Sequence, residues 1–490
     1  MPHFNDPFSA IRAAQESNEE DLFGDLGDDN EQEEQTQEEP ETTSSTEEHT
    51  VLENELGEVN QNEEQNEEDA DFTPNTTEPV ETTVEVTQVD SAAATDGEAV
   101  AKAAGDVEEL GERIVAVETY RAIAKTYGLT PGVGEAIRMG MESIHVSFGR
   151  TNVVPSLESI VSGESGVDTA ADRSLSQTAE RMKDLRTEAL AELEEKVKQQ
   201  YSSTKTFASE QLVKLDQLAQ RLPGLKDDAM ATLNLEGVAY LKADDALVAT
   251  DPRHQDMLED VLKDVYSNIL KHVPKFITDV ASTMRSCKDY NSLEEFAEAL
   301  AKVGAKFPSL EGRRGSLICS LDYEVPAIRT NTLMGEASIV QYRGDKVCGK
   351  SFREVLSSFH YTYGLKFVEQ DTADKSVETV LVPPVHELRE LLEYLEKSCA
   401  NVERLVDVDL FTNIVNEANV SVANYELDDV EKTQHSELIH SIVAGACDLM
   451  GRLGAHATRV ISTSIAFIGE CITALEEATA RQKAGEEAED

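Results

Sequence analysis

The chain has 490 residues and a formal net charge of −53, and that charge is unevenly distributed. Residues 1–118 hold 36 acidic and 3 basic residues, whereas residues 119–490 hold 60 acidic and 40 basic residues. This balance argues against strong direct binding to nucleic-acid phosphates, which carry the same sign of charge. Without a run of about 18 apolar residues, no membrane partner is expected. The six cysteines form no CxxC pair, so we expect free thiols and neither a metal site nor a cofactor.

The first residues contain a short apolar island. Phe4, Phe8 and Ile11 recur at spacings of four and three, so they share one face of a helix within residues 1–16. An isolated apolar cluster in a polar tail often docks onto a partner. We therefore interpret residues 1–16 as a short amphipathic targeting peptide.

A long acidic segment follows the island. No Lys or Arg occurs between Arg12 and Lys102, and large apolar residues are sparse there. Such a composition cannot bury enough apolar surface to offset the entropy of ordering the backbone. The sequence therefore predicts a disordered acidic tail over residues 17–105, with helical order beginning near Asp106.

Beyond the tail the apolar period is helical. Residues 106–150 predict a helical hairpin that turns at Gly128 and restarts at Thr130-Pro131. A linker rich in Gly, Ser and Pro covers residues 151–168, and a long helix with a further helical region covers residues 169–310. Residues 384–490 predict long C-terminal helices. One of them carries a seam with coiled-coil spacing that fades at Thr479, and its apolar positions are Ile461, Ile465, Ile468, Ile472 and Leu475.

Between these helices the period changes to that of strands. Residues 315–328 and 337–344 read as strands, residues 364–382 as a hairpin around a polar turn, and residues 237–249 as another hairpin. The predicted fold is therefore mainly α, with a small α+β module over residues 311–383. The long helices are expected to pack as an elongated, coiled-coil-like bundle behind the acidic tail.

Catalytic signatures are absent from the sequence. It contains no Walker-type GKS or GKT, no HExxH and no GxSxG, and Gly132-Val133-Gly134 lacks the third glycine of a dinucleotide loop. His435 and His440 are five residues apart, which places them off one helical face. We predict no catalytic residues and no metal ligands, and thus a protein that is not an enzyme.

Two small-x-Glu triplets stand out by position. Ala14-Gln15-Glu16 closes the apolar island, and Ala116-Val117-Glu118 lies near the predicted junction between acidic tail and folded body. Similar triplets are frequent in a chain this rich in Ala, Ser, Gly and Glu. Ser156-Leu157-Glu158 and Ser162-Gly163-Glu164 are examples, so position is what distinguishes the first two.

The hairpin segment resembles a known family. Its residues Ala116-Val117-Glu118-Thr119-Tyr120-Arg121, Gly128-Leu129-Thr130-Pro131 and Ala136–Ser143 are similar to a pattern in internal head proteins of giant phiKZ-like tailed bacteriophages. The resemblance covers residues 116–145 and the layout of residues 1–118. It implies a location inside the capsid and an N-terminal propeptide. A prohead protease would remove that propeptide after small-x-Glu triplets, with cleavage between Glu118 and Thr119 and also after Glu16.

The resemblance also implies partners and alternatives. Expected partners are the prohead protease and capsid or other internal head proteins, and the protein would pass through the host cytoplasm during assembly. Self-association into a homo-oligomer and ejection with the DNA are left open. The alternatives are a prohead core or scaffolding protein, a cytosolic acidic adaptor or histone-type chaperone, and a helical enzyme of unknown type.

Overall fold

The structure is a computed structural model, and its contacts divide the chain into two units, residues 1–78 and residues 79–490. All described residues belong to the second unit. The predicted tail over residues 1–79 and 86–90 lies outside them and stays a prediction. The described residues are 80–85, 91–128, 131–148, 167–226, 229–236, 238–310, 315–319, 326–344, 346–369, 378–423 and 429–489.

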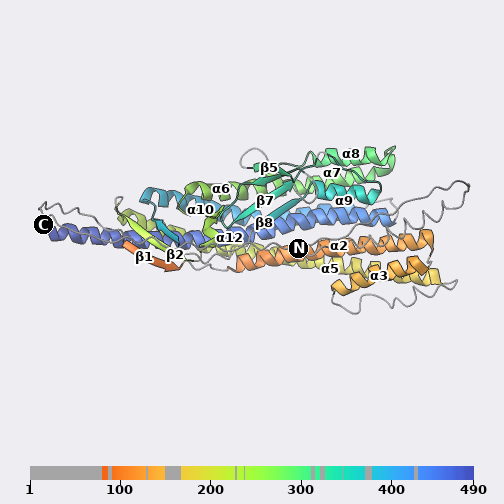
Figure 1. Cartoon of the computed structure of the whole chain (residues 1–490), viewed down its shortest axis with the longest axis horizontal. Helices are drawn as coiled ribbons and strands as arrows, with labels where there is room; N and C mark the ends of the chain where they lie inside the picture. Colours follow the sequence, from red (N-terminus) through yellow and green to blue (C-terminus); the bar gives the residue numbers. More distant parts are fainter. Residues whose placement is uncertain are drawn as a thin grey trace, which may run out of the picture. The chain divides into compact units, whose positions relative to one another are not determined.

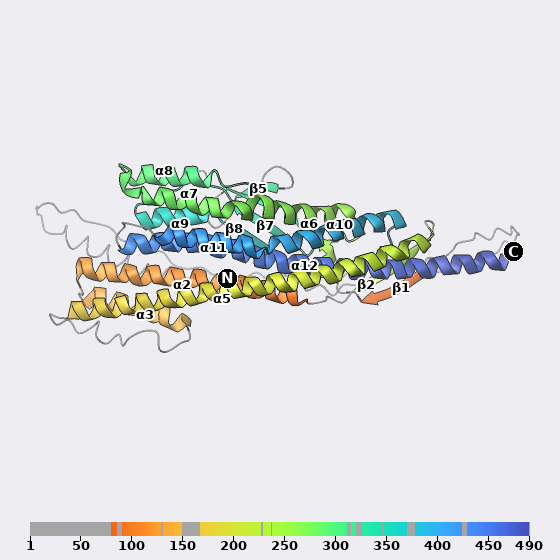
Figure 2. The same ribbon diagram turned by 180° about the vertical axis from the view of Figure 1, so that it is seen from behind.

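Three long helices form the centre of the second unit: α2 (Ala92–Tyr127), α5 (Val167–Arg221) and α12 (Asp429–Glu489). They lie side by side, with α2 in extensive contact with both others (Figure 1). The same arrangement is seen from behind in Figure 2. The predicted mainly α fold, with long packed helices and a few small sheets, is confirmed.

The predicted apolar seam of α12 is buried. Ile461, Ile465, Ile468, Ile472 and Leu475 are each at most 5% exposed. The seam does not fade at Thr479, which is itself buried, and the backbone N–H of Lys226 donates to its hydroxyl oxygen at 3.4 Å. A threonine can therefore continue an apolar seam where a neighbouring donor satisfies its hydroxyl.

Helix α2 begins at Ala92, upstream of the predicted start near Asp106, so the boundary at residue 105 is wrong. The Ser91 hydroxyl caps the helix by accepting from the Ala94 backbone N–H at 3.2 Å. The segment behind this cap is rich in alanine, which has a high helix propensity. Its small side chains carry no strong apolar period, and their burial depends on helices that are remote in sequence.

The shorter helices surround this centre. α3 (Pro131–Phe148) packs on α2, so the predicted hairpin is present. α6 (Pro252–Asp264) leads through a π-helical turn, η3 (Val265–Ile269), and a 3₁₀ turn, η4 (Leu270–His272), into α7 (Val273–Arg285). Among the described residues, the remaining α-helices are α8 (Leu293–Gly304), α9 (Phe352–Thr362), α10 (Val385–Leu405) and α11 (Val408–Ala423).

Three small sheets complete the described unit. β1 (Val80–Glu85) runs parallel to β2 (Ala231–Glu236), and β9 (Glu378–Leu381) pairs antiparallel with β2. β3 (Lys242–Ala243) and β4 (Ala246–Leu247) form the predicted short hairpin. The third sheet is antiparallel, with strand order β5-β6-β7-β8; its strands are β5 (Gly315–Cys319), β6 (Pro326–Thr330), β7 (Ala337–Tyr342) and β8 (Leu365–Glu369).

The predicted hairpin over residues 364–382 is wrong. Phe367 of β8 pairs with Ile339 of β7, whereas Val380 of β9 pairs with Leu233 of β2. The two strands thus belong to different sheets. A local pattern indicates strands but not partners, because the partner is decided by what lies alongside in the folded chain. β1 also falls in the segment that was predicted to be disordered.

Helix α12 also meets, over Glu431–Ala484, the length and composition criteria for a membrane span. However, 72% of its most apolar stretch is buried inside the fold. The central helix of a protein core satisfies the same criteria, and the contacts of α12 with α2 and α5 account for its apolar character.

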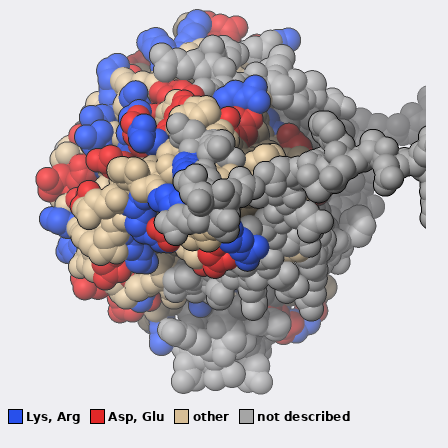
Figure 3. Space-filling model, turned by 90° about the vertical axis from the view of Figure 1, so that its left-hand side faces the viewer, with Lys and Arg blue, Asp and Glu red and all other residues tan. Residues whose placement is uncertain are grey.

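On the face seen in Figure 3, Lys and Arg side chains of the described residues are mixed with Asp and Glu.

Candidate functional site

The residues singled out by sequence fall into two groups. Phe4, Phe8, Ile11 and Ala14-Gln15-Glu16 lie outside the described residues, so their predicted targeting and cleavage roles stay predictions. Ala116-Val117-Glu118-Thr119 lie inside α2, well before its end at Tyr127. The structure therefore places the second triplet in the interior of a long helix.

The Glu118 side chain is buried and paired with cations. Glu118 is 1% exposed, Lys183 Nζ of α5 lies 2.9 Å from its Oε1, and Arg121 Nη1 lies 3.4 Å from its Oε2. Burial lowers the pKa of Lys183, but hydrogen bonds to Glu118 and Glu180 outweigh it, so that pKa is raised overall. The Lys183 ammonium is therefore charged at neutral pH.

The two residues before Glu118 are also buried, whereas Thr119 is partly exposed. Val117 is 0% exposed and Ala116 is 9% exposed. Next to them, Arg121 Nε donates to Asp172 Oδ1 of α5 at 2.8 Å. A protease that binds its substrate in an extended conformation cannot engage these residues until this part of α2 opens.

A second polar contact between helices lies further towards the start of α2. Arg186 Nη1 of α5 lies 3.2 Å from Glu437 Oε2 of α12. The carboxylate packs directly against Gly111 of α2, where an added Cβ would lie 1.9 Å from Glu437 Oε2. Burial raises the pKa of Glu437 to about 8, although Arg186 opposes the shift. Gly111, which weakens an isolated helix, here makes room for the Glu437 side chain beside Arg186.

A third polar group brings together Glu108 of α2, His360 of α9 and Ser441 of α12. Ser441 Oγ lies 3.1 Å from His360 Nδ1, and His360 Nε2 lies 3.5 Å from Glu108 Oε1. The hydrogen bond to His360 lowers the pKa of Glu108 although burial opposes the shift. The set resembles a Ser-His-Glu constellation. However, Ser441 sits in the interior of α12, where peptide N–H groups bond along the helix and cannot form an oxyanion hole.

One acidic group has spacing that a cation could use. The carboxylates of Asp256, Glu259 and Asp260 on α6 lie within 4.8 Å of one another. Glu259 Oε1 already accepts a hydrogen bond from Asn401 Nδ2 at 2.8 Å. Half-buried acidic groups on one helix face are common without an ion, so this group supports no assignment.

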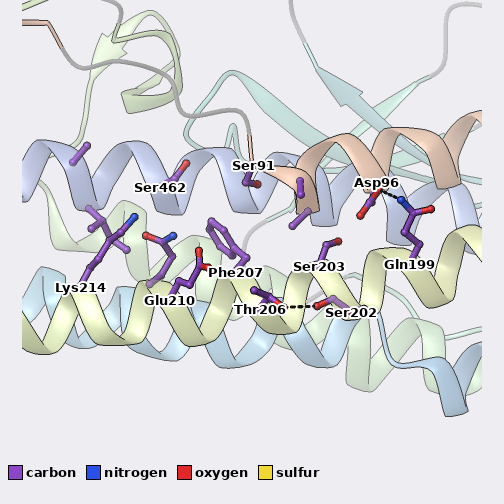
Figure 4. Close-up of a pocket in the computed structure, with 15 residues that line it drawn as sticks. Ser91, Asp96, Gln199, Ser202, Ser203, Thr206, Phe207, Glu210, Lys214 and Ser462 are labelled. Carbon is purple, nitrogen blue, oxygen red and sulfur yellow. Dashed lines mark hydrogen bonds between the residues drawn. The ribbon is translucent and has the colours of Figure 1, made fainter.

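A groove of about 560 Å³ opens where α2 begins between α5 and α12 (Figure 4). Asp96 of α2 accepts a hydrogen bond from Gln199 Nε2 of α5 across it at 2.8 Å. Ser91, Phe207 and Ile465 line the groove from three segments of the chain. The groove lies where α2 begins, so α2, α5 and α12 pack together on one side of it and only α5 and α12 continue on the other.

Sequence reasoning missed Lys183, Arg186 and Glu437. Lys183 is 65 residues from Glu118, and Arg186 is 251 residues from Glu437. No local spacing could connect such pairs. The only available signal was the unusual placement of charge on faces that are otherwise apolar.

The comparisons with known proteins agree with the resemblance noted in the sequence. The family model of phiKZ-like phage internal head proteins matches residues 31–419. The match spans α2 to α10 and most of α11, and it ends before α12. No curated protein and no solved structure matches the chain. Because the family model covers most of its length, this chain belongs to the phiKZ-like phage internal head proteins.

Proposed function

We propose that this structural protein of the phage head interior is made as a precursor and loses its acidic N-terminal region by cleavage after small-x-Glu triplets during prohead maturation. Family membership supports the location inside the virion head and association with capsid components. The charge distribution carries the processing step: residues 1–79 hold 26 acidic residues and a single basic one, Arg12. A segment of this charge repels incoming DNA and occupies volume, and cutting it into peptides removes both obstacles.

In this proposal a prohead protease is the processing partner. Residues 1–16 direct the precursor into the prohead through the apolar face of Phe4, Phe8 and Ile11. The protease cuts after Glu16 and after Glu118. The precursor assembles from the host cytoplasm with capsid or other internal head proteins.

The burial of Glu118 restricts the timing of the second cut. A protease that binds its substrate in an extended conformation reaches Glu118 only in a chain whose α2 has not yet docked, or after local opening of α2. The pair with Lys183 disfavours that opening, because separating the helices leaves two charges to be rehydrated. We therefore place this cut before docking of α2 is complete.

Two matched variants test the cleavage site. Glu118→Gln and Lys183→Gln each weaken the same buried pair, but only Glu118→Gln alters the triplet. We expect Glu118→Gln to leave unprocessed precursor in assembled particles, whereas Lys183→Gln matures at least as fast as wild type. Sequencing of the mature N-terminus, which should be Thr119, provides the readout. Normal maturation of Glu118→Gln would exclude Glu118 as the site.

A second experiment tests targeting. Changing Phe4, Phe8 and Ile11 together to Ser removes the apolar face while leaving all charges in place. We expect the triple variant to accumulate in the cell and to be missing from particles.

The alternative, a scaffolding role, is tested with the wild-type protein, which would then be present in proheads and absent from mature virions.

A further inference from the structure

We propose that cleavage after Glu118 does not release the N-terminal three quarters of α2. Instead, residues 92–118 dock between α5 and α12 as they do in the uncut chain, and the mature protein consists of two chains held non-covalently. This inference rests on the proposed processing. In the step itself, water adds across the peptide bond between Glu118 and Thr119. The products are an α-carboxylate on Glu118 and an α-ammonium on Thr119.

The apolar packing of the segment supports retention. Val100, Val107, Ile114 and Val117 are 0% exposed, and Leu110 is 8% exposed. Their spacing follows one face of α2, which is covered by α5 and α12. Release of the segment would expose this face together with the facing apolar surfaces of both other helices. Because burial of apolar surface is the main driving force of association, and the cut does not change that surface, the segment still binds α5 and α12.

The backbones of α2 and α12 also fit closely. A Cβ on Gly97 would lie 2.6 Å from the carbonyl oxygen of Gly451, and a Cβ on Gly451 would lie 2.6 Å from the carbonyl oxygen of Gly97. The two glycines therefore let the helices cross in direct contact. Such complementarity belongs to a permanent interface, because each helix is shaped for the other.

Polar contacts fix the register of the segment. Asp96 accepts from Gln199 of α5 at 2.8 Å (Figure 4). Glu98 pairs with Arg459 of α12, and Glu108 accepts from Ser441 Oγ at 3.3 Å. Upstream, β1 pairs with β2 over its full length from Val80 to Glu85. All of these contacts lie on the N-terminal side of the cut and survive it.

The new ends fall in a favourable place. Lys183 Nζ lies 2.9 Å from the side-chain Oε1 of Glu118, so the last residue of the fragment keeps its ion pair with α5. Downstream, Arg121 keeps its hydrogen bond to Asp172 and Tyr120 stays buried at 1% exposure. The remaining turns of α2 therefore hold Thr119 near its original position.

Retention has a consequence for the acidic tail. If residues 92–118 remain bound, a cut after Glu118 alone leaves residues 1–79 attached to the body. Removing the charge then needs a further cut upstream of Val80, where small-x-Glu triplets end at Glu16, Glu19 and Glu47. The cut after Glu16 removes only Asp6 and Glu16 among the acidic residues, so a cut after Glu47 or elsewhere in the tail is required.

The main test uses protein from mature particles. Size-exclusion chromatography under native conditions is followed by mass spectrometry under denaturing conditions. Coelution of a chain that starts at Thr119 with a fragment that ends at Glu118 supports retention. A folded body that starts at Thr119 without the fragment overturns it.

An uncut chain would contradict the proposed processing, and the docking is then decided by hydrogen exchange on the intact protein. Amides of residues 92–118 should exchange about 1,000-fold more slowly than unprotected amides, as should those of residues 179–218. Fast exchange confined to residues 92–118 would overturn the inference. Gly97→Leu, which collides with backbone, should lower retention or protection of the segment. Gly105→Leu, where an added Cβ meets nothing within 4 Å, is the matched control.

Discussion

Two neighbouring helices carry the same kind of triplet in opposite settings. Ala116-Val117-Glu118 in α2 ends at a glutamate that is 1% exposed and paired with Lys183 of another helix. Gly140-Met141-Glu142 in α3 ends at a glutamate whose side chain is 49% exposed and pairs locally, with Arg138 at 2.5 Å. The comparison shows that a three-residue signal says little about access, since packing decides which glutamate a protease can reach.

The largest expected difference between the two helices comes from charge placed on an apolar position. Ile114→Asp puts a carboxylate at a site that is 0% exposed between α2 and its partners. We expect it to lower the free energy of unfolding by about 3–5 kcal/mol, because a buried unpaired charge is costly. Met139→Asp on α3, at a site 55% exposed, is the control. Equal melting temperatures for the two variants would contradict the described packing of α2.

Removing the cation of each pair gives the next largest difference. Lys183→Met leaves the Glu118 carboxylate buried with Arg121 as its remaining cation, and we expect a loss of about 1–3 kcal/mol in unfolding free energy. Arg138→Met on α3 removes two surface pairs, with Glu135 and with Glu142, and should leave the melting temperature unchanged within error. Urea denaturation of both variants provides the measurement. A neutral Lys183→Met would mean that the pair does not hold α2 to α5.

Acidification should destabilise the buried packing of α2, α5 and α12 through two histidines of α12. Burial lowers the pKa of His435 and of His440 to about 3, in both cases with a smaller contribution from a nearby arginine. Their stabilising contribution is complete above pH 6.5 and is lost as the pH falls from there towards 3, because the unfolded chain binds the protons first. Each histidine should cost about 2 kcal/mol at pH 5.

Glu437 acts in the opposite direction. Its folded pKa of about 8 lies above the ordinary value of 4.5, so its contribution to stability is present at low pH and declines as the pH rises from 4.5 to 8.

Because the pKa of buried His440 is lowered, His440→Gln should reduce the loss of stability between pH 7 and pH 5, measured by thermal melts at each pH. His272→Gln, at an exposed position, is the matched control variant. An unaltered profile in His440→Gln would show that this histidine is not buried as neutral imidazole.

The smallest expected effect separates two glycines of α2. Gly105→Ala adds a Cβ that meets nothing within 4 Å, so it should stabilise the protein by about 0.5–1 kcal/mol through helix propensity. Gly111→Ala gains the same propensity but displaces the carboxylate of Glu437 from its place beside Arg186, and it should be neutral or destabilising. If both variants stabilise equally, Glu437 does not pack against Gly111.

Helix content and strand positions were predictable because they depend on local periodicity. The buried isoleucine seam of α12, the extent of α5 and the strands near Gly315 and Ala337 all follow from apolar spacing that a single segment carries. The family resemblance likewise came from short local motifs in residues 116–145.

By itself, the sequence determined the acidic character of the first residues, the mainly helical fold and the family. Tertiary structure alone decided that α2 starts at Ala92, that β9 pairs with β2, and that Glu118 is enclosed by Lys183. Each of these depends on contacts between segments far apart in the chain, where alanines and glycines allow close approach and a buried charge finds its partner. Such contacts produce no periodic pattern within one segment of the sequence, because they depend equally on residues of a second segment far away in the chain.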